Sequence, residues 1–308
     1  MDTIGKVRVG TPKAFRNLTV FPLFDGNATA AYVTLDEALA RGSARITEVN
    51  EGGSVPNLAF VNAGEKPVLL LDGEELLGAR QNRVLNLTIL APPSTTIVIP
   101  VSCVEAGRWS ATSASFSSAP RTQYAEGRAR KMAQVSASME RGSRASDQGA
   151  VWRDIDRKFE RFGVRSPTGS MSLLFETESV QVEDVVQAFS VEDGQVGAIF
   201  AIEGRFVGFD LFDASDSFRK LFAKLLRSYA LDAIEASQTT PVPALAQPLL
   251  SQRDAAAFLT SVTEANVSQF PAIGEGQDLR LNGNGISGAA LLANDRIVHL
   301  AAFRQEPC

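Results

Sequence analysis

The sequence predicts an α+β fold, and the distribution of its apolar residues carries that prediction. In the first 110 residues, short aliphatic runs alternate with turns rich in Gly, Pro and Asn, as in a β-sandwich or a small barrel. Later stretches repeat their apolar residues at helical spacing, and further strand-like runs follow them. We therefore expect a β-rich unit at 1–110, a loop and basic helical segment at 111–165, and an α+β unit at 166–308 packed on the first.

Two kinds of local pattern define the elements of the first unit. Aliphatic runs predict strands at residues 17–24, 44–49, 58–61, 68–71, 84–90 and 97–104. Thr34 followed three residues later by Glu37 is the pattern of a capping box, which predicts that a short helix begins there. An Asp-Gly pair at residues 72–73 predicts a turn, and in the simplest interpretation Glu74 and Glu75 after it are solvated.

The middle segment differs in composition. Residues 110–121 are rich in serine and alanine and predict a surface loop, whereas residues 122–162 predict two helices separated near 142–149. Between Arg121 and Arg165 there are eleven Lys and Arg against six Asp and Glu. A solvated helix face is the simplest interpretation of this excess. Attraction of a phosphate or docking of a protein partner is the alternative.

The last unit combines helices with strands. Helical patterns cover residues 178–189, 215–237 and 254–262, and strand patterns cover 198–202, 206–212, 265–270, 278–281, 288–292 and 297–303. The apolar stripe of 215–237 predicts a core helix, and residues 238–248 form a proline-containing connector. Glycines at 283, 285 and 288 match the spacing of a dinucleotide fingerprint, but too few residues follow for its helix. The Asn-Gly pairs there predict a hairpin turn instead.

Composition excludes several classes of function. A net charge of -5 gives no overall attraction to nucleic acid or to an anionic membrane. Two distant cysteines, Cys103 and Cys308, do not form a disulfide framework, which fits a reducing cytoplasm. The first residues lack the apolar core of a signal peptide, and no apolar run is long enough to span a bilayer. We expect a soluble cytoplasmic protein without a membrane or nucleic-acid partner.

The chain has one histidine, His299. Metal sites built from several histidines are therefore excluded within one chain. His299 alternates with apolar residues in a predicted strand, which favours a structural, hydrogen-bonded histidine; a general base is the alternative.

Residues 67–109 hold an unusual density of polar side chains between predicted strands. Gln81, Asn82, Arg83 and Asn86 are costly to bury unless each finds a hydrogen-bonding partner. One solution is internal, in which they satisfy loop carbonyls and bind a nearby carboxylate. The other is a ligand rich in donors and acceptors, and the sequence leaves both open.

The second solution assigns roles to neighbouring residues. Arg83 and Arg108 could clamp a phosphate or carboxylate, and Trp109 could stack on the same ligand. Cys103 on an aliphatic strand is expected to be a buried thiol, although a nearby arginine could activate it.

The carboxylates of this region are candidates for proton transfer. Because no histidine is near in sequence, Glu74, Glu75 or Glu105 would serve as general acid or base in an enzyme. With Asp72 they could also hold a hard cation, but their spacing matches no calcium loop. We expect no metal and no cofactor.

Two blocks in this region resemble the signature of a known family. They read Leu71-Asp-Gly-Glu-Glu-Leu-Leu-Gly-Ala-Arg-Gln-Asn-Arg and Ile99-Pro-Val-Ser-Cys-Val-Glu-Ala-Gly-Arg-Trp. They are similar to the ARG and rhodanese-phosphatase-superfamily-associated protein domain, a prokaryotic domain of unknown function, and residues 211–233 and 298–303 are similar to its later segments. The resemblance implies genomic association with ADP-ribosylglycohydrolase-type and phosphatase-type proteins. That association favours a nucleotide-derived or phosphorylated ligand.

Two functions follow as hypotheses. The first is a ligand-binding or hydrolase-like pocket at the polar signature, for a nucleotide-derived or phosphorylated small molecule. The second is a non-catalytic interaction module in which the polar cluster holds the fold and a protein partner docks on the basic helical segment.

Overall fold

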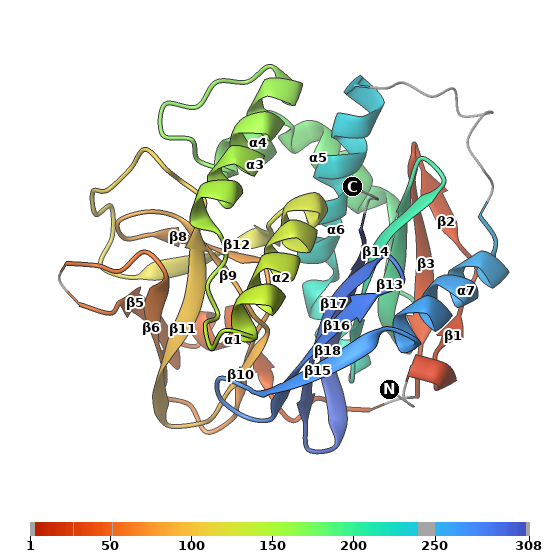
Figure 1. Ribbon diagram of the computed structural model, residues 1–308, viewed down its shortest axis with the longest axis horizontal. Coiled ribbons are helices and arrows are strands. Elements are labelled where there is room, and N and C mark those ends of the chain that lie inside the picture. Colours follow the sequence, from red (N-terminus) through yellow and green to blue (C-terminus); the bar gives the residue numbers. More distant parts are fainter. Residues whose placement is uncertain (1–3, 27, 51, 240–249, 306–308) are drawn as a thin grey trace.

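A computed structural model describes residues 4–26, 28–50, 52–239 and 250–305, and they form an α+β structure with two main sheets (Figure 1). The larger sheet has nine strands in the order β1-β3-β13-β14-β18-β17-β16-β15, with β2 also paired to β3. Its strand pairs are antiparallel. The strands are β1 (Arg8–Val9), β2 (Lys13–Phe15), β3 (Leu18–Phe24), β13 (Gln195–Ile202), β14 (Arg205–Phe212), β15 (Asn266–Pro271), β16 (Gln277–Gly283), β17 (Ile286–Ala293) and β18 (Arg296–Arg304).

The second sheet lies in the first part of the chain, where a β-sandwich or a small barrel was expected, and it curls into a half-barrel. Its six strands run in the order β12-β8-β9-β11-β6-β5, and a three-stranded sheet, β10-β7-β4, lies beside it. Its core is apolar and includes Leu58, Phe60 and Ile99. The strands are β4 (Val33–Thr34), β5 (Ala44–Glu48), β6 (Asn57–Asn62), β7 (Val68–Leu70), β8 (Glu74–Gly78), β9 (Arg83–Leu85), β10 (Ile89–Ala91), β11 (Thr95–Cys103) and β12 (Phe116–Thr122).

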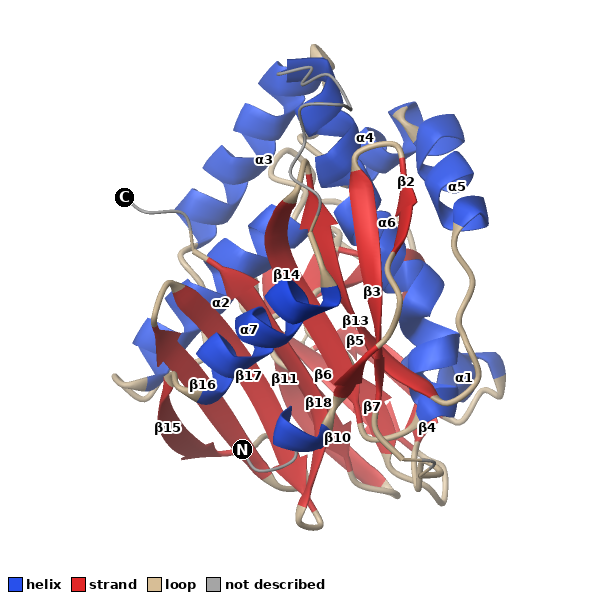
Figure 2. Ribbon diagram, turned by 90° about the vertical axis from the view of Figure 1, so that its right-hand side faces the viewer, coloured by secondary structure: helices blue, strands red, loops and turns tan. Residues whose placement is uncertain are grey.

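Helices cover the sheets and connect them. Figure 2 shows α7 across one face of the nine-stranded sheet, where Phe258 and Val262 join its apolar layer. On the other face α6 packs against β13 and also contacts β12, so this helix links the two sheets. The helices are the 3-10 helix η1 (Ile4–Lys6), α1 (Leu35–Ala40), α2 (Ala125–Met139), α3 (Gln148–Phe162), α4 (Ser172–Thr177), α5 (Ser179–Ala188), α6 (Ser215–Thr239) and α7 (Gln252–Thr263).

Most local predictions are confirmed. The capping box is present, because the Thr34 side chain accepts from the Glu37 backbone and Glu37 accepts from the Thr34 backbone at 3.0 Å. The two middle helices, the core helix α6 and the hairpin turn at Asn284 form as expected. The predicted connector at 238–248 lies largely outside the described residues.

The predicted strand at residues 84–90 is wrong as a single element. β9 ends at Leu85 and β10 begins at Ile89. Between them the Asn86 N–H donates to the Pro100 carbonyl, and the Thr88 hydroxyl accepts from the Asp72 N–H at 3.1 Å. Polar side chains and hydrogen bonds to distant segments of the same chain therefore interrupt the strand between Leu85 and Ile89. An aliphatic pattern in the sequence does not reveal such contacts.

The predicted surface loop at residues 110–121 is wrong in its second half. Phe116–Thr122 forms β12, which pairs with β8 through partners such as Ser117 and Leu77. Serine has a low tendency to form strands, so the pairing partner, distant in sequence, decides this conformation.

Three strands of the first 110 residues, β1, β2 and β3, belong to the larger sheet. β3 pairs with β13 along its whole length, including Leu18 with Ile202. The division of the chain at residues 110 and 165 stays a prediction.

Candidate functional site

The polar signature is carried by the β8–β9 hairpin and by the loop after β11. Along residues 81–83 successive side chains take different partners: Gln81 and Arg83 bond to each other, while Asn82 reaches toward the loop before α4. This alternation is that of an extended chain, whose side chains point to opposite sides in turn. The hairpin therefore serves two separate polar environments.

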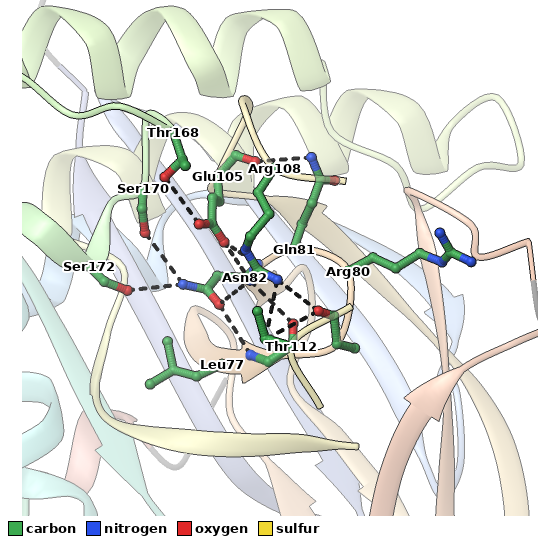
Figure 3. A network of polar contacts seen from close by, with 12 residues as sticks. Leu77, Arg80, Gln81, Asn82, Glu105, Arg108, Thr112, Thr168, Ser170 and Ser172 are labelled. Atoms are coloured by element: carbon green, nitrogen blue, oxygen red, sulfur yellow. Dashed lines mark hydrogen bonds and ion pairs between the residues drawn. The ribbon is translucent and has the colours of Figure 1, made fainter. Parts of the chain in front are cut away.

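Asn82 is the hub of the first environment, drawn in Figure 3. Its side-chain amide donates to the hydroxyls of Ser170 at 3.4 Å and Ser172 at 3.2 Å. Its oxygen accepts from the Gly78 N–H at 3.2 Å and from Nη2 of Arg108 at 3.1 Å. These contacts satisfy both ends of the amide and fix its orientation.

Glu105 and Arg108 hold this hub in place. Oε2 of Glu105 accepts from Nη2 of Arg108 at 2.6 Å and from the Asn82 N–H at 3.1 Å, and Oε1 accepts from Thr168 at 3.1 Å. Nη1 of Arg108 donates to the carbonyl of Ala79 at 2.7 Å. The Arg108 guanidinium is thus engaged by groups of the protein itself, in a geometry that braces the loop.

Glu75 joins the same network from β8. It is fully buried, with Oε2 accepting from Nε of Arg121 at 2.5 Å and Oε1 accepting from the Ser172 hydroxyl at 2.8 Å. Burial raises the pKa of Glu75, although Arg121 and the hydroxyl of Ser172 oppose the rise. A continuous polar path therefore runs from Arg121 through Glu75, Ser172 and Asn82 to Arg108.

Glu74 lies apart from this network, because adjacent residues of a strand face opposite sides. It is also fully buried, and it accepts from Nζ of Lys224 at 2.7 Å and from the Leu71 N–H at 2.8 Å. The turn at residues 72–73 forms as predicted. The interpretation of Glu74 and Glu75 as solvated is wrong, because each carboxylate meets a buried cation supplied by a distant helix or strand.

Gln81, Arg83 and Cys103 form the second environment. Oε1 of Gln81 accepts from Nη1 of Arg83 at 3.0 Å and from Sγ of Cys103 at 3.2 Å, and its amide donates to the Glu105 carbonyl at 3.0 Å. Arg83 is fully buried, and its Nε and Nη2 have no hydrogen-bonding partner among the described residues. Trp109, 46% exposed, lies with its ring centroid 5.8 Å from the Arg83 guanidinium carbon.

Burial decides the state of Cys103. It raises the pKa of this thiol, while the Glu105 N–H and Arg83 pull the pKa in the other direction without reversing the shift. The expectation of a buried thiol on a strand is confirmed.

Asn86 is not brought to the Asn82 hub. Its amide donates to the carbonyl of Arg144 at 3.1 Å, and its oxygen accepts from Ser102 at 2.6 Å. Asn86 therefore ties the β9 end to the segment between α2 and α3.

A cavity opens beside the Asn82 hub. Its volume is about 540 Å³, and Asn82, Ser170 and Ser172 form part of its wall. Six of its eleven lining residues carry hydroxyl groups, and its one charged lining residue among those described is Glu176. The lining residues are Leu77, Gly78, Asn82, Thr112, Ser113, Ser115, Phe116, Ser117, Ser170, Ser172 and Glu176.

The sequence interpretation missed the hydroxyl-bearing residues of this site. Thr168 and Ser170 come from the loop before α4 and Ser172 is the first residue of α4, all far from the signature in sequence. The run Ser166-Pro-Thr-Gly-Ser-Met-Ser is rich in hydroxyls, but such runs are also common in ordinary surface loops. Long-range contacts bring the two segments together: the Glu105–Ser170 bridge, the hydrogen bonds of Thr168 to Glu105 and of Ser172 to Glu75, and those of Asn82.

His299 lies in a different buried cluster between the two sheets. Nε2 of His299 lies 3.2 Å from Oδ1 of Asp210, and Nδ1 lies 2.8 Å from the Thr88 hydroxyl. Arg128 donates to both oxygens of Asp210, at 2.8 and 3.2 Å. The expected hydrogen-bonded histidine is therefore found, and it is 1% exposed.

The basic helical segment is only partly solvated. Arg128, Lys131 and Lys158 are buried on faces of α2 and α3, so the interpretation as a solvated face is wrong for these three residues. Lys158 Nζ lies 2.7 Å from Asp232 and also contacts Glu235 and Glu126. Each of these three buried cations has a carboxylate partner from a segment distant in sequence. Among the described residues, no helix is both long enough and apolar enough to cross a membrane.

Comparison with curated proteins and with solved structures found no match. A family model matches residues 6–303, and its description is ARG and Rhodanese-Phosphatase-superfamily-associated Protein domain. The match covers both signature blocks, the loop before α4 and the two sheets. Since it spans nearly the whole chain, the protein belongs to the family of the ARG and Rhodanese-Phosphatase-superfamily-associated Protein domain.

Proposed function

We propose that the cavity beside Asn82 binds a small hydroxyl-rich molecule and is hydrolase-like in its chemistry. One observation carries the proposal: an open hollow of about 540 Å³ has hydroxyl groups on six of its eleven lining residues, with the oriented Asn82 amide in its wall. Hollows of this size accommodate small ligands, and a few fixed polar groups set their orientation.

The charges of the residues that line the cavity indicate which class of ligand suits it. No Lys or Arg occurs among the described residues that line the cavity, whereas Glu176 does. A phosphate prefers arginine or lysine partners, so the sugar part of a nucleotide-derived or phosphorylated compound suits this wall better than its phosphate. The ribosyl group of such a compound offers hydroxyls that both donate and accept, as the serines do.

The predicted site residues other than Glu74, which binds Lys224 away from the cavity, take roles in this proposal. Asn82 contacts the ligand, Glu105 and Arg108 keep its amide oriented, and Glu75 is the buried carboxylate that exchanges protons with the site through Ser172. Gln81, Arg83, Cys103 and Trp109 support the hairpin from the opposite side, and Asn86 anchors the end of β9.

A variant that fills the cavity tests the proposal without removing the network. Ser117→Phe adds a ring in the lining, and Ser110→Phe adds the same ring on an exposed loop residue outside it. We expect a thermal shift from a panel of nucleosides, nucleotides and sugar phosphates in wild type and Ser110→Phe, and its loss in Ser117→Phe. The proposal is wrong if no compound shifts the wild-type protein or if Ser117→Phe responds as wild type does.

A second candidate is the interaction module with a structural polar cluster. The saturation of Arg108 by internal acceptors favours it. In that case Glu105→Ala would lower the free energy of unfolding by roughly 3–5 kcal/mol, as for a buried pair that loses one partner. The ligand panel would then shift neither wild type nor the cavity variants.

A further inference from the structure

We propose that Ser172 is a nucleophile for acyl transfer in this cavity, with Glu75 accepting its proton. The inference rests on the proposed function, because it takes the same cavity as the substrate site. It adds the reacting atom and the class of substrate.

The first support is a hydroxyl–carboxylate pair at the cavity wall. The Ser172 hydroxyl donates to Oε1 of Glu75 at 2.8 Å, and Ser172 lines the cavity while Glu75 is completely buried behind it. A serine hydroxyl is a weak nucleophile until an adjacent base takes its proton. Here the base is fixed, because Arg121 holds the other oxygen, Oε2, at 2.5 Å.

Burial makes Glu75 a stronger base than a solvated carboxylate. It raises the pKa of Glu75 against the opposing effects of Arg121 and of the hydrogen bond from Ser172. A carboxylate with a raised pKa is better matched to proton transfer near neutral pH than one at its usual value.

A fixed amide donor completes the arrangement. Nδ2 of Asn82 lies 3.2 Å from Oγ of Ser172, and the Asn82 oxygen is held by Arg108 and the Gly78 N–H. Oriented donors that meet developing negative charge stabilise the tetrahedral state of acyl transfer. The Asn82 amide therefore lies beside the position at which an oxyanion next to Ser172 would form.

Other hydroxyls of the site lack one of these features. Thr168 also donates to a carboxylate, Glu105 at 3.1 Å, but it is not among the residues that line the cavity. Ser170 lines the cavity and accepts from the same Asn82 amide at 3.4 Å. The serine of this network that donates to the Glu75 carboxylate is Ser172. Ser170 therefore lacks the neighbouring base that Ser172 has.

The charges of the wall favour an ester without charge at the reacting centre. Phosphoryl transfer relies on cations that neutralise the equatorial oxygens, and the cavity wall offers Glu176 in their place. The substrate class that fits is an acyl ester of a hydroxyl-rich alcohol, such as an acylated sugar or nucleoside.

The reaction balances with water as the co-reactant. Oγ of Ser172 forms a bond to the carbonyl carbon while its proton passes to Glu75, and the bond to the leaving alcohol then breaks as that alcohol takes the proton. Water next attacks the acyl carbon and gives its proton to Glu75. The bond to Oγ breaks, the carboxylic acid leaves, and Ser172 regains its proton.

Covalent labelling of the whole chain tests the inference. A fluorophosphonate probe reacts with activated serines, and peptide mass spectrometry locates the label. We expect labelling at Ser172 in wild type and in Ser110→Ala, which removes an exposed hydroxyl outside the cavity, and none at this position in Ser172→Ala. Glu75→Gln should slow labelling on the order of 100-fold, the usual contribution of general base catalysis.

A second measurement covers the case in which Glu75→Gln does not fold. The labelling rate of wild type should fall as the pH drops through the raised pKa of Glu75, because the protonated carboxyl no longer accepts a proton. Absence of any label on Ser172, or a rate independent of pH and of Glu75→Gln in folded protein, overturns the inference.

The labelling experiment and the ligand-binding experiment can fail independently of each other. If nucleosides or sugars shift the thermal transition while Ser172 stays unlabelled, binding stands and acyl transfer is wrong. If Ser172 is labelled while no compound of the panel binds, the ligand class is wrong and the nucleophile stands.

Discussion

Nζ of Lys131 lies 2.6 Å from Oδ1 of Asp72, and both side chains are shielded from solvent. Oδ2 of the same aspartate lies 3.5 Å from Nε of Arg128, which in turn binds Asp210 in the nine-stranded sheet. The first turn of the polar signature is thus tied through α2 to the opposite sheet. Two cations and two carboxylates therefore pair with one another in this cluster.

Loss of the Arg128 guanidinium should cost much of the stability of the fold. Arg128→Ala leaves Asp210 buried without its main partner, and we expect the free energy of unfolding to fall by roughly 3–5 kcal/mol. Urea unfolding followed by circular dichroism measures the difference. As a control, Arg219→Ala removes a partner of Asp193 from an exposed pair and should change stability by less than about 1 kcal/mol. Equal losses of unfolding free energy in the two variants would contradict a stabilising role for the buried Arg128–Asp210 pair.

Gly73 has no room for a side chain. Its φ is +82°, and a Cβ there would lie 2.9 Å from Cδ of Arg128. Gly142 has a similar φ of +76° with nothing within 4 Å of such a Cβ. Gly142→Ala should therefore cost only the backbone strain, roughly 1–2 kcal/mol, and Gly73→Ala about 1–3 kcal/mol more because Arg128 must move. Thermal unfolding of the two variants checks this order.

The carboxylates around Lys158 should make stability depend on pH. Burial raises the pKa of Asp232 to about 6, with Lys158 opposing and Glu126 adding to the rise. An unfolded aspartate has a pKa near 3.9, so between about pH 4 and pH 6 the folded state binds more protons than the unfolded state. Stability from this group is therefore greatest at low pH and falls as the pH rises through about 6.

Urea titrations at several pH values test that sign. Between about pH 4.5 and pH 7 the wild type should lose more stability than Asp232→Asn, which cannot titrate at this position. The variant also weakens the contact with Lys158, and this shifts its stability without adding the pH dependence of Asp232. Parallel curves for the two proteins would show that Asp232 does not titrate in this range.

Cys103 should react slowly with thiol reagents. Burial raises its pKa and its side chain is inaccessible to solvent, so little accessible thiolate exists at pH 8. In a Cys308→Ser background, alkylation by iodoacetamide should be negligible in buffer and rapid in concentrated urea. Fast labelling in buffer would mean that Arg83 controls this thiol more than burial does.

Elements defined by neighbouring residues were predictable. The capping box of Thr34 and Glu37 and the stripe of α6 depend on residues within one or two turns, and the structure confirms both. The Asn-Gly turn near residue 284 likewise depends on the backbone preferences of those residues. The signature blocks identified the family for the same reason, since each is continuous in the chain.

Pairings between distant residues were not predictable. β12 forms from a serine-rich stretch because β8 lies beside it, and Ser172 reaches Glu75 across 97 positions of sequence. Glu74 and Glu75 follow each other directly, yet one meets Lys224 and the other Arg121.

The sequence alone therefore determined the fold class, most helices and strands, and the segment that holds the polar signature. The tertiary structure alone decided which of those polar groups satisfy one another, and which face an open cavity. The physical reason is that periodicity and turn chemistry act over a few residues, whereas a buried charge is stabilised by whichever opposite charge the packing of sheets and helices brings within reach.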